Sequence, residues 1–151
     1  MQVIFEPIGA VSNEVSEKKD HGWGQDCSKI VVNKEYQDGL QGLSDFSHII
    51  VVYYLDKAQF EANRHLVRRP QGRADMPMVG IFSQRAKDRP NPIGITAVRL
   101  VDVKDNVIAV QGLDAINGTP VLDIKPYYPV YDCRPDATVP EWVDELMKEY
   151  F

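Results

Sequence analysis

Apolar and polar positions along this chain recur mostly in the short patterns of β-strands. Alternating or continuously apolar runs predict strands at residues 2–11, 28–32, 46–55 and 95–100. The run at 46–55 is apolar at nearly every position, which is typical of a strand buried on both faces. Because Gly, Pro and Asn break these runs and helical periods are few, the pattern predicts an all-β barrel or strongly bent sheet with one or two short helices.

Two dipeptides in the second half of the chain are turn signals. Asp105-Asn106 predicts a hairpin between the apolar runs on either side of it. Asn117-Gly118 is the strongest two-residue hairpin signal in the sequence. We therefore expect antiparallel neighbours around each dipeptide.

Helical signals are confined to two segments. Residues 34–43 lead to glycines before the next apolar run, which suits a helical turn. Trp142, Leu146 and Met147 recur at helical spacing within residues 141–150, so a short C-terminal helix is expected.

The stretch 78–100 joins two apolar runs through a charged loop that holds two prolines. Pro90 and Pro92 each fix their own φ at about −65° and restrict the preceding residue, Arg89 or Asn91. The loop is therefore expected to hold its polar side chains in a preset arrangement, as a binding loop does. A rigid connection between two strands would have the same residues, and this alternative stays open.

The formal net charge is −5, which argues against a protein that grips nucleic acid by its overall charge. The basic residues are nevertheless concentrated, because residues 64–89 hold seven Lys or Arg against two Asp, a local charge of +5 that leaves −10 for the rest. The seven are Arg64, Arg68, Arg69, Arg73, Arg85, Lys87 and Arg89. Such a segment is either a solvated face or a surface that contacts phosphates beside the charged loop.

Length, cysteines and histidines narrow the class of protein. The chain suits one domain, Cys27 and Cys133 lie far apart, and no CxxC or HxxxH spacing indicates a metal. Nothing resembles a signal peptide or an apolar span of about 18 residues, so we expect a soluble cytoplasmic protein with free thiols, no membrane contact and no metal. His48 is expected to be a hydrogen-bonded structural residue in preference to a base.

Three blocks of the sequence resemble those of a known family. They are DFSHIIVVYYLDK at 45–57, GIFSQRAKDRPNPIG at 80–94 and LDAINGTPVLDIKPYYPVYD at 113–132. Their order and residues are similar to the TrmO/YaeB-type (TsaA-like) family of S-adenosylmethionine-dependent tRNA methyltransferases, over roughly residues 3–132. The chain looks like the shorter branch of that family, without the additional C-terminal domain of longer members.

The resemblance implies a fold and a cofactor. It implies a mainly β fold, a small antiparallel β-barrel over residues 1–135, with residues 136–151 packed on the same domain as a helix. It also implies that S-adenosylmethionine binds without the glycine-rich βα turn of most methyltransferases, which is absent here. Family members are dimers with the cofactor near the subunit interface, so a homodimer is expected.

Cofactor-binding residues are implied at three places. They are Asp56 and Lys57; Phe82, Ser83, Gln84 and Arg85; and Ile95, Gln111, Gly112, Leu113 and Asp114. Asp114 is chemically suited to accept ribose hydroxyls. Longer members have His-Gln at the first place, where this chain has Asp56 and Lys57. They also have a proline-arginine-glutamine element where this chain has HGWGQ. Trp23 is therefore either a substitute apolar wall for the cofactor or a cover for the barrel end.

The implied partner is the anticodon loop of a tRNA, and the implied acceptor is the N6 nitrogen of N6-threonylcarbamoyladenosine. Implied substrate contacts are Arg89, Asn91 and Lys125 near the base, with Arg68 and Arg69 on phosphates. Because this N6 belongs to a urea and loses its proton more readily than an ordinary amine, no strong base is demanded. If a side chain takes the proton, Asp123 is the first candidate, with Tyr127 positioning the base; Asp123 could equally cap the loop.

Two functions of other classes stay open at this point. One is a regulatory β-barrel that binds a cofactor or nucleotide without transferring a methyl group. The other is an unrelated structural barrel whose proline-rich loop is only a connector. Calorimetry with S-adenosylmethionine separates the structural barrel from the rest, and a methyl-transfer assay on tRNA separates an enzyme from a binder.

Overall fold

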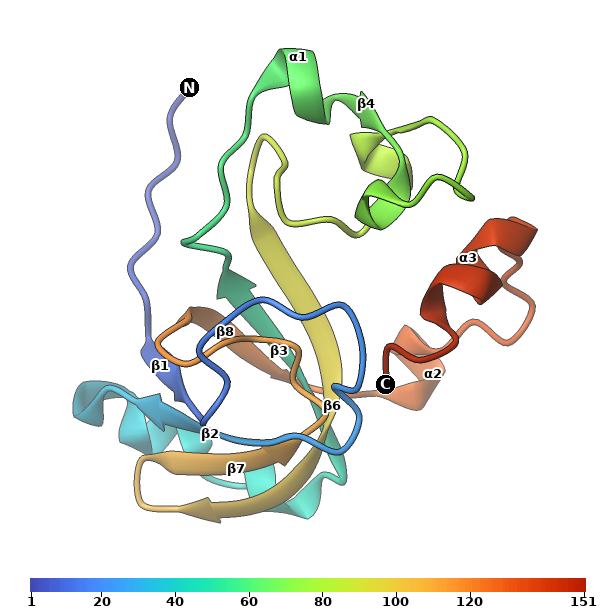
Figure 1. Ribbon diagram of the computed structural model, residues 1–151. Coiled ribbons are helices and arrows are strands. Elements are labelled where there is room, and N and C mark those ends of the chain that lie inside the picture. The colour runs from blue at the N-terminus through green and yellow to red at the C-terminus, as the bar shows by residue number, and fades with distance from the viewer.

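Six antiparallel strands form a closed barrel in the computed structural model, which describes residues 1–151 (Figure 1). In order around the barrel they are β1 (Gly9–Ser12), β2 (Cys27–Val32), β7 (Val107–Gln111), β6 (Ile93–Lys104), β3 (His48–Tyr54) and β8 (Pro120–Pro126). β8 pairs with β1 and so closes the ring, which removes the open edge of the sheet. The predicted mainly β barrel is confirmed.

The barrel interior is filled by apolar side chains from alternate strand positions. The core cluster consists of Val11, Ile30, Val32, Ile49, Val51, Tyr53, Val98, Ile108, Val110, Leu113, Ala115 and Val121. On β3 the side chains at 49, 51 and 53 are buried, whereas Ile50 and Val52 are only partly buried. The strand therefore has one buried face where the sequence predicted two, since the wall of a barrel has a single interior side.

β6 and β7 form the hairpin predicted around Asp105-Asn106. Their pairing ends with Lys104 opposite Val107. Asp105 has a φ of 54°, in the left-handed region that Asp and Asn tolerate in tight turns. This hairpin prediction is confirmed.

The second turn signal, Asn117-Gly118, forms a turn but no hairpin. β7 ends before it and β8 begins after it, yet these two strands pair with other neighbours. The N–H groups of Asn117 and Gly118 donate to the carbonyl oxygens of Val15 (2.7 Å) and Val11 (2.8 Å). The hairpin prediction is wrong, because the dipeptide fixes only a local conformation, a φ of 84° at Gly118, while distant packing selects the partner.

The first strand is shorter than predicted. Regular pairing begins at Gly9, and residues 2–7 are exposed outside the barrel. Pro7 has no N–H to donate to a ladder, so pairing does not extend through it. At Gly9 a side chain would clash with β2, since an added Cβ would lie 2.4 Å from the carbonyl oxygen of Val31.

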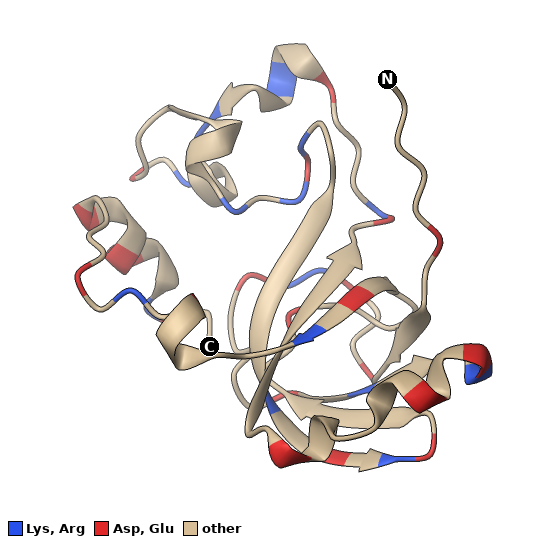
Figure 2. Cartoon of the chain, turned by 180° about the vertical axis from the view of Figure 1, so that it is seen from behind, with Lys and Arg blue, Asp and Glu red and all other residues tan.

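Residues 56–92, between β3 and β6, form the basic insertion, a separate layer above the barrel (Figure 1). Its elements are α1 (Ala62–His65), β4 (Val67–Arg68), η3 (Pro70–Gly72), β5 (Val79–Gly80) and η4 (Ile81–Ser83), where η denotes a 3₁₀ helix. β4 and β5 pair as a two-stranded antiparallel sheet. Figure 2 shows Lys and Arg gathered on this part of the chain, so the charge concentration seen in the sequence is also a concentration in space.

Short helices complete the fold. η1 (Lys34–Leu40) and η2 (Leu43–Asp45) precede β3, and α2 (Pro129–Asp132) and α3 (Glu141–Met147) follow β8. The predicted helical turn at 34–43 and the C-terminal helix are confirmed. α3 lies beside the basic insertion, where Glu145 approaches Arg73 at 3.9 Å (Figure 1). None of the helices has both the length and the apolar composition needed to cross a membrane.

Candidate functional site

The carboxylate of Asp114 lies at the centre of a hydroxyl cluster. Tyr53 on β3 donates to its Oδ1 at 2.9 Å, and Thr96 on β6 donates to the same oxygen. Tyr150, which follows α3, donates to Oδ2 at 2.6 Å. Three hydroxyl groups from distant parts of the sequence thus converge on one carboxylate.

The chain after β7 places Asp114 in this cluster. Gly112 has a φ of 90°, which side chains rarely adopt, and its N–H donates to the carbonyl oxygen of Asp26 at 3.0 Å. Leu113 and Ala115 are buried in the barrel core. Asp114 is held between these two anchors, so the position of its carboxylate is fixed by packing.

The two tyrosines of the cluster stay protonated. Burial raises the pKa of the Tyr53 and Tyr150 hydroxyls, and the negative charge of Asp114 raises it further. Both groups are therefore hydrogen-bond donors at neutral pH. A carboxylate that already holds several hydroxyls has the chemistry needed to hold the hydroxyls of a ribose, the role implied for Asp114 by the sequence.

Sequence reasoning did not identify Tyr53, Thr96 or Tyr150. Tyr53 and Thr96 lie in mostly apolar stretches, at 49–55 and 93–98, and a hydroxyl in such a stretch was the available signal. Tyr150 carries no comparable signal, because only the path of the chain after α3 brings it to the barrel. Its backbone oxygen accepts the N–H of Trp23 at 2.8 Å, which fixes that path.

Arg85 and Ile95, two of the predicted cofactor residues, lie next to the cluster. The Arg85 guanidinium donates to the backbone oxygen of Ile95 at 2.6 Å, one residue before Thr96. Its positive charge also acts on Tyr53, where it opposes the rise in the pKa of the hydroxyl. The structure thus brings Arg85 and Ile95, from within and directly after the block at 80–94, together with Asp114 from the block at 113–132.

The other predicted cofactor residues are spread over the insertion and the ends of two barrel strands. Phe82 and Ser83 are exposed on η4, and Gln111 is the last residue of β7. Asp56 and Lys57 follow β3 and pair with each other at 3.4 Å. The structure places these residues around the insertion and the barrel end without joining them by direct contacts to Asp114.

Gln84 is an internal tie of the basic insertion. The residue is 6% exposed, and its Nε2 donates to the carbonyl oxygens of Arg68 (3.0 Å) and Val79 (2.9 Å). These oxygens belong to β4 and β5. The amide of Gln84 therefore holds the two short strands together.

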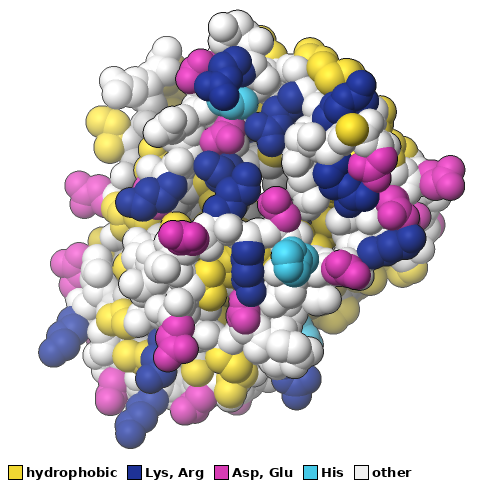
Figure 3. Space-filling model, viewed as in Figure 1, with side chains coloured by type: hydrophobic (Ala, Val, Ile, Leu, Met, Phe, Trp, Pro, Cys, Tyr) yellow, Lys and Arg dark blue, Asp and Glu magenta, His cyan; other side chains and the backbone are white.

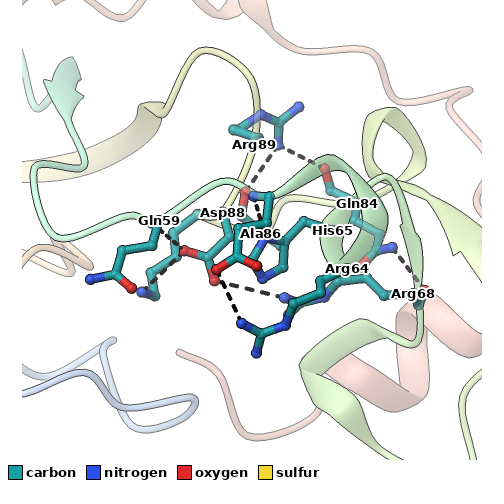
Figure 4. Close-up of polar contacts among 10 residues, drawn as sticks. Gln59, Arg64, His65, Arg68, Gln84, Ala86, Asp88 and Arg89 are labelled. Atoms are coloured by element: carbon teal, nitrogen blue, oxygen red, sulfur yellow. Dashed lines mark hydrogen bonds and ion pairs between the residues drawn. The ribbon is translucent and has the colours of Figure 1, made fainter.

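The charged loop that contains Pro90 and Pro92, called the proline-rich loop from here on, is also held by hydrogen bonds within the chain. Arg89 donates to the carbonyl oxygens of Gln84 (3.0 Å) and Ala86 (3.2 Å), as Figure 4 shows. Asn91 is exposed at the tip of the loop. The guanidinium of Arg89 therefore ties the start of the loop to itself, so this predicted substrate contact has partners within the protein.

Asp88 ties the same loop to the rest of the insertion. Its Oδ1 accepts the Gln59 N–H at 2.9 Å and lies 3.3 Å from Lys87 Nζ, while Oδ2 lies 3.7 Å from Arg68 Nη1. Burial raises the pKa of Asp88, but the hydrogen bond from Gln59 and the charge of Lys87 outweigh it, so the pKa lies below its usual value. The carboxylate therefore stays ionised at neutral pH.

Basic side chains gather over the insertion, with acidic side chains between them (Figure 3). Arg69 donates to the carbonyl oxygen of Met76, and Arg73 pairs with Asp75 at 2.6 Å. The side chain of Arg68 is 23% exposed. The predicted phosphate contacts Arg68 and Arg69 thus have partners within the protein.

The predicted catalytic pair is divided between two parts of the barrel. Asp123 on β8 pairs with Val52 on β3, and Val52 also pairs with Ile95, so Asp123 lies two strands from that predicted cofactor residue. Asp123 and Lys125 on β8 pair at 2.6 Å, and this hydrogen bond raises the pKa of Lys125. Tyr127 follows β8, and its N–H donates to the carbonyl oxygen of His48 at 3.2 Å. His48 begins β3, and Tyr53 of the hydroxyl cluster lies about 16 Å further along that strand. One copy of the chain does not bring Tyr127 to the cluster.

Trp23 is buried by the residues around it. It is 3% exposed, and its Nε1 donates to the carbonyl oxygen of Lys19 at 3.2 Å. The ammonium of Lys19 lies 4.7 Å from the centre of the ring. The indole therefore lies beneath other residues and offers no open wall in this structure.

The remaining cysteine and histidine predictions concern single residues. Cys27 and Cys133 are exposed free thiols. His48 is hydrogen-bonded, with Nδ1 2.8 Å from the hydroxyl oxygen of Ser47. No three His, Cys, Asp or Glu side chains come together in an arrangement that would hold a metal ion.

Relatives match most of the chain. A protein of Pyrococcus abyssi described as a probable S-adenosyl-L-methionine-binding protein is 35% identical over 150 residues, covering 96% of this chain and 78% of that protein. The tRNA (adenine(37)-N6)-methyltransferase of Escherichia coli is 35% identical over 147 residues, covering 89% of this chain and 61% of that enzyme. The human protein of the same name is 38% identical over 112 residues, covering 74% and 24%.

Solved structures and a family model agree with these relatives. A crystal structure of TrmO from P. aeruginosa matches with a TM-score of 0.77 at 27% identity, covering 94% of this chain and 62% of that chain. The model of the tRNA-methyltransferase O N-terminal domain matches residues 18–133, a span that includes the basic insertion and Asp114. This chain therefore belongs to the tRNA-methyltransferase O N-terminal domain family.

Proposed function

We propose that this protein transfers a methyl group from S-adenosylmethionine to the N6 nitrogen of an adenine in the anticodon loop of tRNA. The observation that carries the proposal is the convergence of Arg85, Ile95 and Asp114 at the hydroxyl cluster, with the basic insertion above the barrel. The family and the names of the E. coli and human relatives support the same reaction.

The residues at the cluster fit a nucleoside cofactor. Asp114 accepts hydroxyl hydrogen bonds on both oxygens, so it can exchange the Tyr150 hydroxyl for a ribose hydroxyl and keep the same number of partners. Arg85 is exposed beside it and can donate to a carboxylate of the cofactor. Ile95, 49% exposed, offers an apolar contact for the adenine ring. When bound, S-adenosylmethionine supplies an electrophilic methyl group on a positively charged sulfur.

The part played by the protein is mainly positioning. Holding N6 close to the methyl group and in line with its bond to sulfur can remove several kcal/mol of the barrier, roughly 7–11 kcal/mol in the best cases. N6 must also lose a proton. We propose N6-threonylcarbamoyladenosine as the acceptor, because its N6 belongs to a urea and releases that proton without a strong base.

Asp123, Tyr127 and Lys125 take part in this proposal through a homodimer. If β8 of one copy lies against the Asp114 site of the other, Asp123 can accept the proton and Tyr127 can position the base. Lys125 would then pair with the carboxylate of the acceptor. The 80% exposure of Phe82 supports the dimer, because an interface near this site would cover that ring.

The basic insertion is the proposed tRNA surface. The local charge of +5 over its residues 64–89 supports this role, since phosphate contacts need concentrated Lys and Arg. Arg68 and Arg69 are the proposed phosphate contacts, and Arg89 and Asn91 are proposed near the base. We propose the cytoplasm as the location, because tRNA is the substrate.

Calorimetry with S-adenosylmethionine tests the cofactor part of the proposal. Arg85→Ala should weaken binding by about 1–3 kcal/mol, the range for a lost charge-assisted hydrogen bond. Lys104→Ala is the matched control, because it removes an exposed cation at the opposite end of β6, and it should bind like the wild type. A wild-type protein that does not bind S-adenosylmethionine contradicts the proposal. Binding without methyl transfer would make the protein a regulatory β-barrel.

A further inference from the structure

A hollow in the basic insertion has no apolar side chain in its lining. Its volume is about 350 Å³. It is lined by Lys57 and Gln59 from the segment after β3, by Arg64 and His65 from α1, and by Lys87 from the proline-rich loop. Figure 4 shows Arg64, His65 and Asp88 close together in this region. Such a composition suits a polar ligand with many hydrogen-bonding atoms.

His65 offers a fixed donor to this hollow. The residue is 8% exposed, and its Nδ1 accepts the backbone N–H of Glu61 at 2.8 Å. Because Nδ1 is the acceptor, the neutral ring carries its proton on Nε2. No protein group accepts a hydrogen bond from Nε2, and this nitrogen is not sealed from solvent. A buried imidazole thus lines the hollow with an unused N–H donor.

The charges of the hollow favour an anion. Its cations are Lys57, Arg64 and Lys87 and its carboxylates are Glu61 and Asp88, which leaves +1 with a neutral imidazole. Glu61 accepts from one guanidinium nitrogen of Arg64, at 3.2 Å, and the other N–H groups of that guanidinium stay available. The side chains of Arg64 and Lys57 are 66% and 71% exposed, so both can turn toward a ligand.

We propose that this hollow binds a phosphate group of the tRNA backbone. The proposal rests on the proposed function, because tRNA is the ligand. A phosphate presents a negative charge and several acceptor oxygens, which match the His65 N–H, the Arg64 guanidinium and the Lys87 ammonium. These donors come from α1 and the proline-rich loop, so a bound phosphate would tie the two together and fix the loop that carries Arg85.

His65→Asn and Arg64→Ala test this site, with Lys104→Ala as the matched control. Asn keeps an acceptor near the Nδ1 position for the Glu61 N–H but removes the Nε2 donor. Fluorescence anisotropy with tRNA over a salt series should show affinity weakened by about tenfold in both variants. The slope of log affinity against log salt should fall by about one for Arg64→Ala. Lys104→Ala should match the wild type, and S-adenosylmethionine affinity should be unchanged in all three.

Free inorganic phosphate has the same charge and acceptor oxygens as a backbone phosphate, so it could also bind in the hollow. A competition titration with inorganic phosphate distinguishes free phosphate from tRNA as the ligand. We expect inorganic phosphate to displace tRNA more readily from the wild type than from Arg64→Ala. Chloride at equal ionic strength is the control for each protein. Wild-type tRNA affinity and salt slope in both variants would overturn the proposal, even if inorganic phosphate binds. If the variants lose tRNA affinity while the wild type neither binds S-adenosylmethionine nor methylates tRNA, the proposed function fails and the phosphate site stands.

Discussion

The barrel and the basic insertion are held together by different interactions. The barrel encloses a core cluster of 12 apolar residues inside a ring of strands that pair on both sides. Of residues 56–92 only five are buried, namely His65, Pro70, Met76, Ile81 and Gln84. The insertion depends instead on side chains that bond to backbone oxygens and on ion pairs around Asp88.

This difference separates stability from function within one domain. Hydrophobic burial dominates folding free energy, so the barrel should determine whether the chain is folded. Hydrogen bonds contribute less each but fix geometry, so the insertion should determine whether the proposed site is in place. Substitutions in the two regions should therefore have different signatures, one in unfolding and the other in activity.

The largest stability effect is expected in the barrel. Ile49 is completely buried on β3, so Ile49→Ala should lower the free energy of unfolding by about 2–5 kcal/mol through lost transfer energy and a cavity. Val67→Ala, at a 57% exposed position of the insertion, should change it by less than about 0.5 kcal/mol. Urea unfolding measures both values. Equal losses for the two variants would contradict the division between the regions.

The largest effect on activity is expected in the insertion. Replacing Pro90 and Pro92 by Ala keeps every polar side chain but widens the free loop, which should cost about 0.4–1 kcal/mol of stability per site. A loop that is about 1 Å out of place can slow a reaction on the order of 100-fold, so methyl transfer should fall far more than stability does. Pro140→Ala, before α3, is the control and should keep wild-type activity. A double variant with the wild-type rate would make the loop a simple connector.

Gln84 tests the hydrogen bonds of the insertion. Gln84→Ala leaves the carbonyl oxygens of Arg68 and Val79 without their partner, which should destabilise the insertion by about 1–3 kcal/mol. Hydrogen exchange should show faster exchange at the Ile81 N–H, which bonds to Leu66, and unchanged protection in the barrel strands. Faster exchange throughout the barrel would mean that the two regions unfold as one unit.

The smallest effect concerns alkaline pH and should come from the hydroxyl cluster around Asp114 in preference to the insertion. The pKa of Tyr53 is raised by burial above its usual 10.0, whereas the basic insertion contains no tyrosine. Above about pH 10 the unfolded chain loses this proton and the folded chain keeps it, so stability should fall by up to about 1.4 kcal/mol per pH unit. Tyr53→Phe should make this fall less steep in urea unfolding between pH 9 and 11, about one unit either side of the usual value. Part of the fall should remain, because the pKa of Tyr150 is raised as well. An equally steep fall in the variant would remove Tyr53 as the cause.

The same contrast explains which features were predictable from the sequence. Strands such as β3 and the β6–β7 hairpin follow from apolar runs and a local turn signal, because the barrel is built from short repeating patterns. The blocks that resemble the family led to Arg85, Ile95 and Asp114, which the structure brings together. Those residues could be named from sequence because each lies in a recognisable block or directly after one.

Contacts between distant side chains could not be predicted. Nothing in the sequence pairs Tyr150 with Asp114, or Gln84 with the backbone of β4 and β5. Asn117-Gly118 shows the same limit, since its turn is formed as predicted but its partners are chosen by packing against β1. The internal bonds of Arg89 were also hidden, because a charged loop residue looks solvent-facing in sequence.

The proposed function requires that the Asp114 cluster and the basic insertion together form a tRNA methyltransferase site. The most direct measurement is methyl transfer from isotope-labelled S-adenosylmethionine to tRNA, followed by mass spectrometry of the digested nucleosides. We expect the label on N6 of a modified adenosine from the anticodon loop, with Arg85→Ala slower than the wild type and Lys104→Ala unchanged. Wild-type protein that binds S-adenosylmethionine but places no label in tRNA would contradict it.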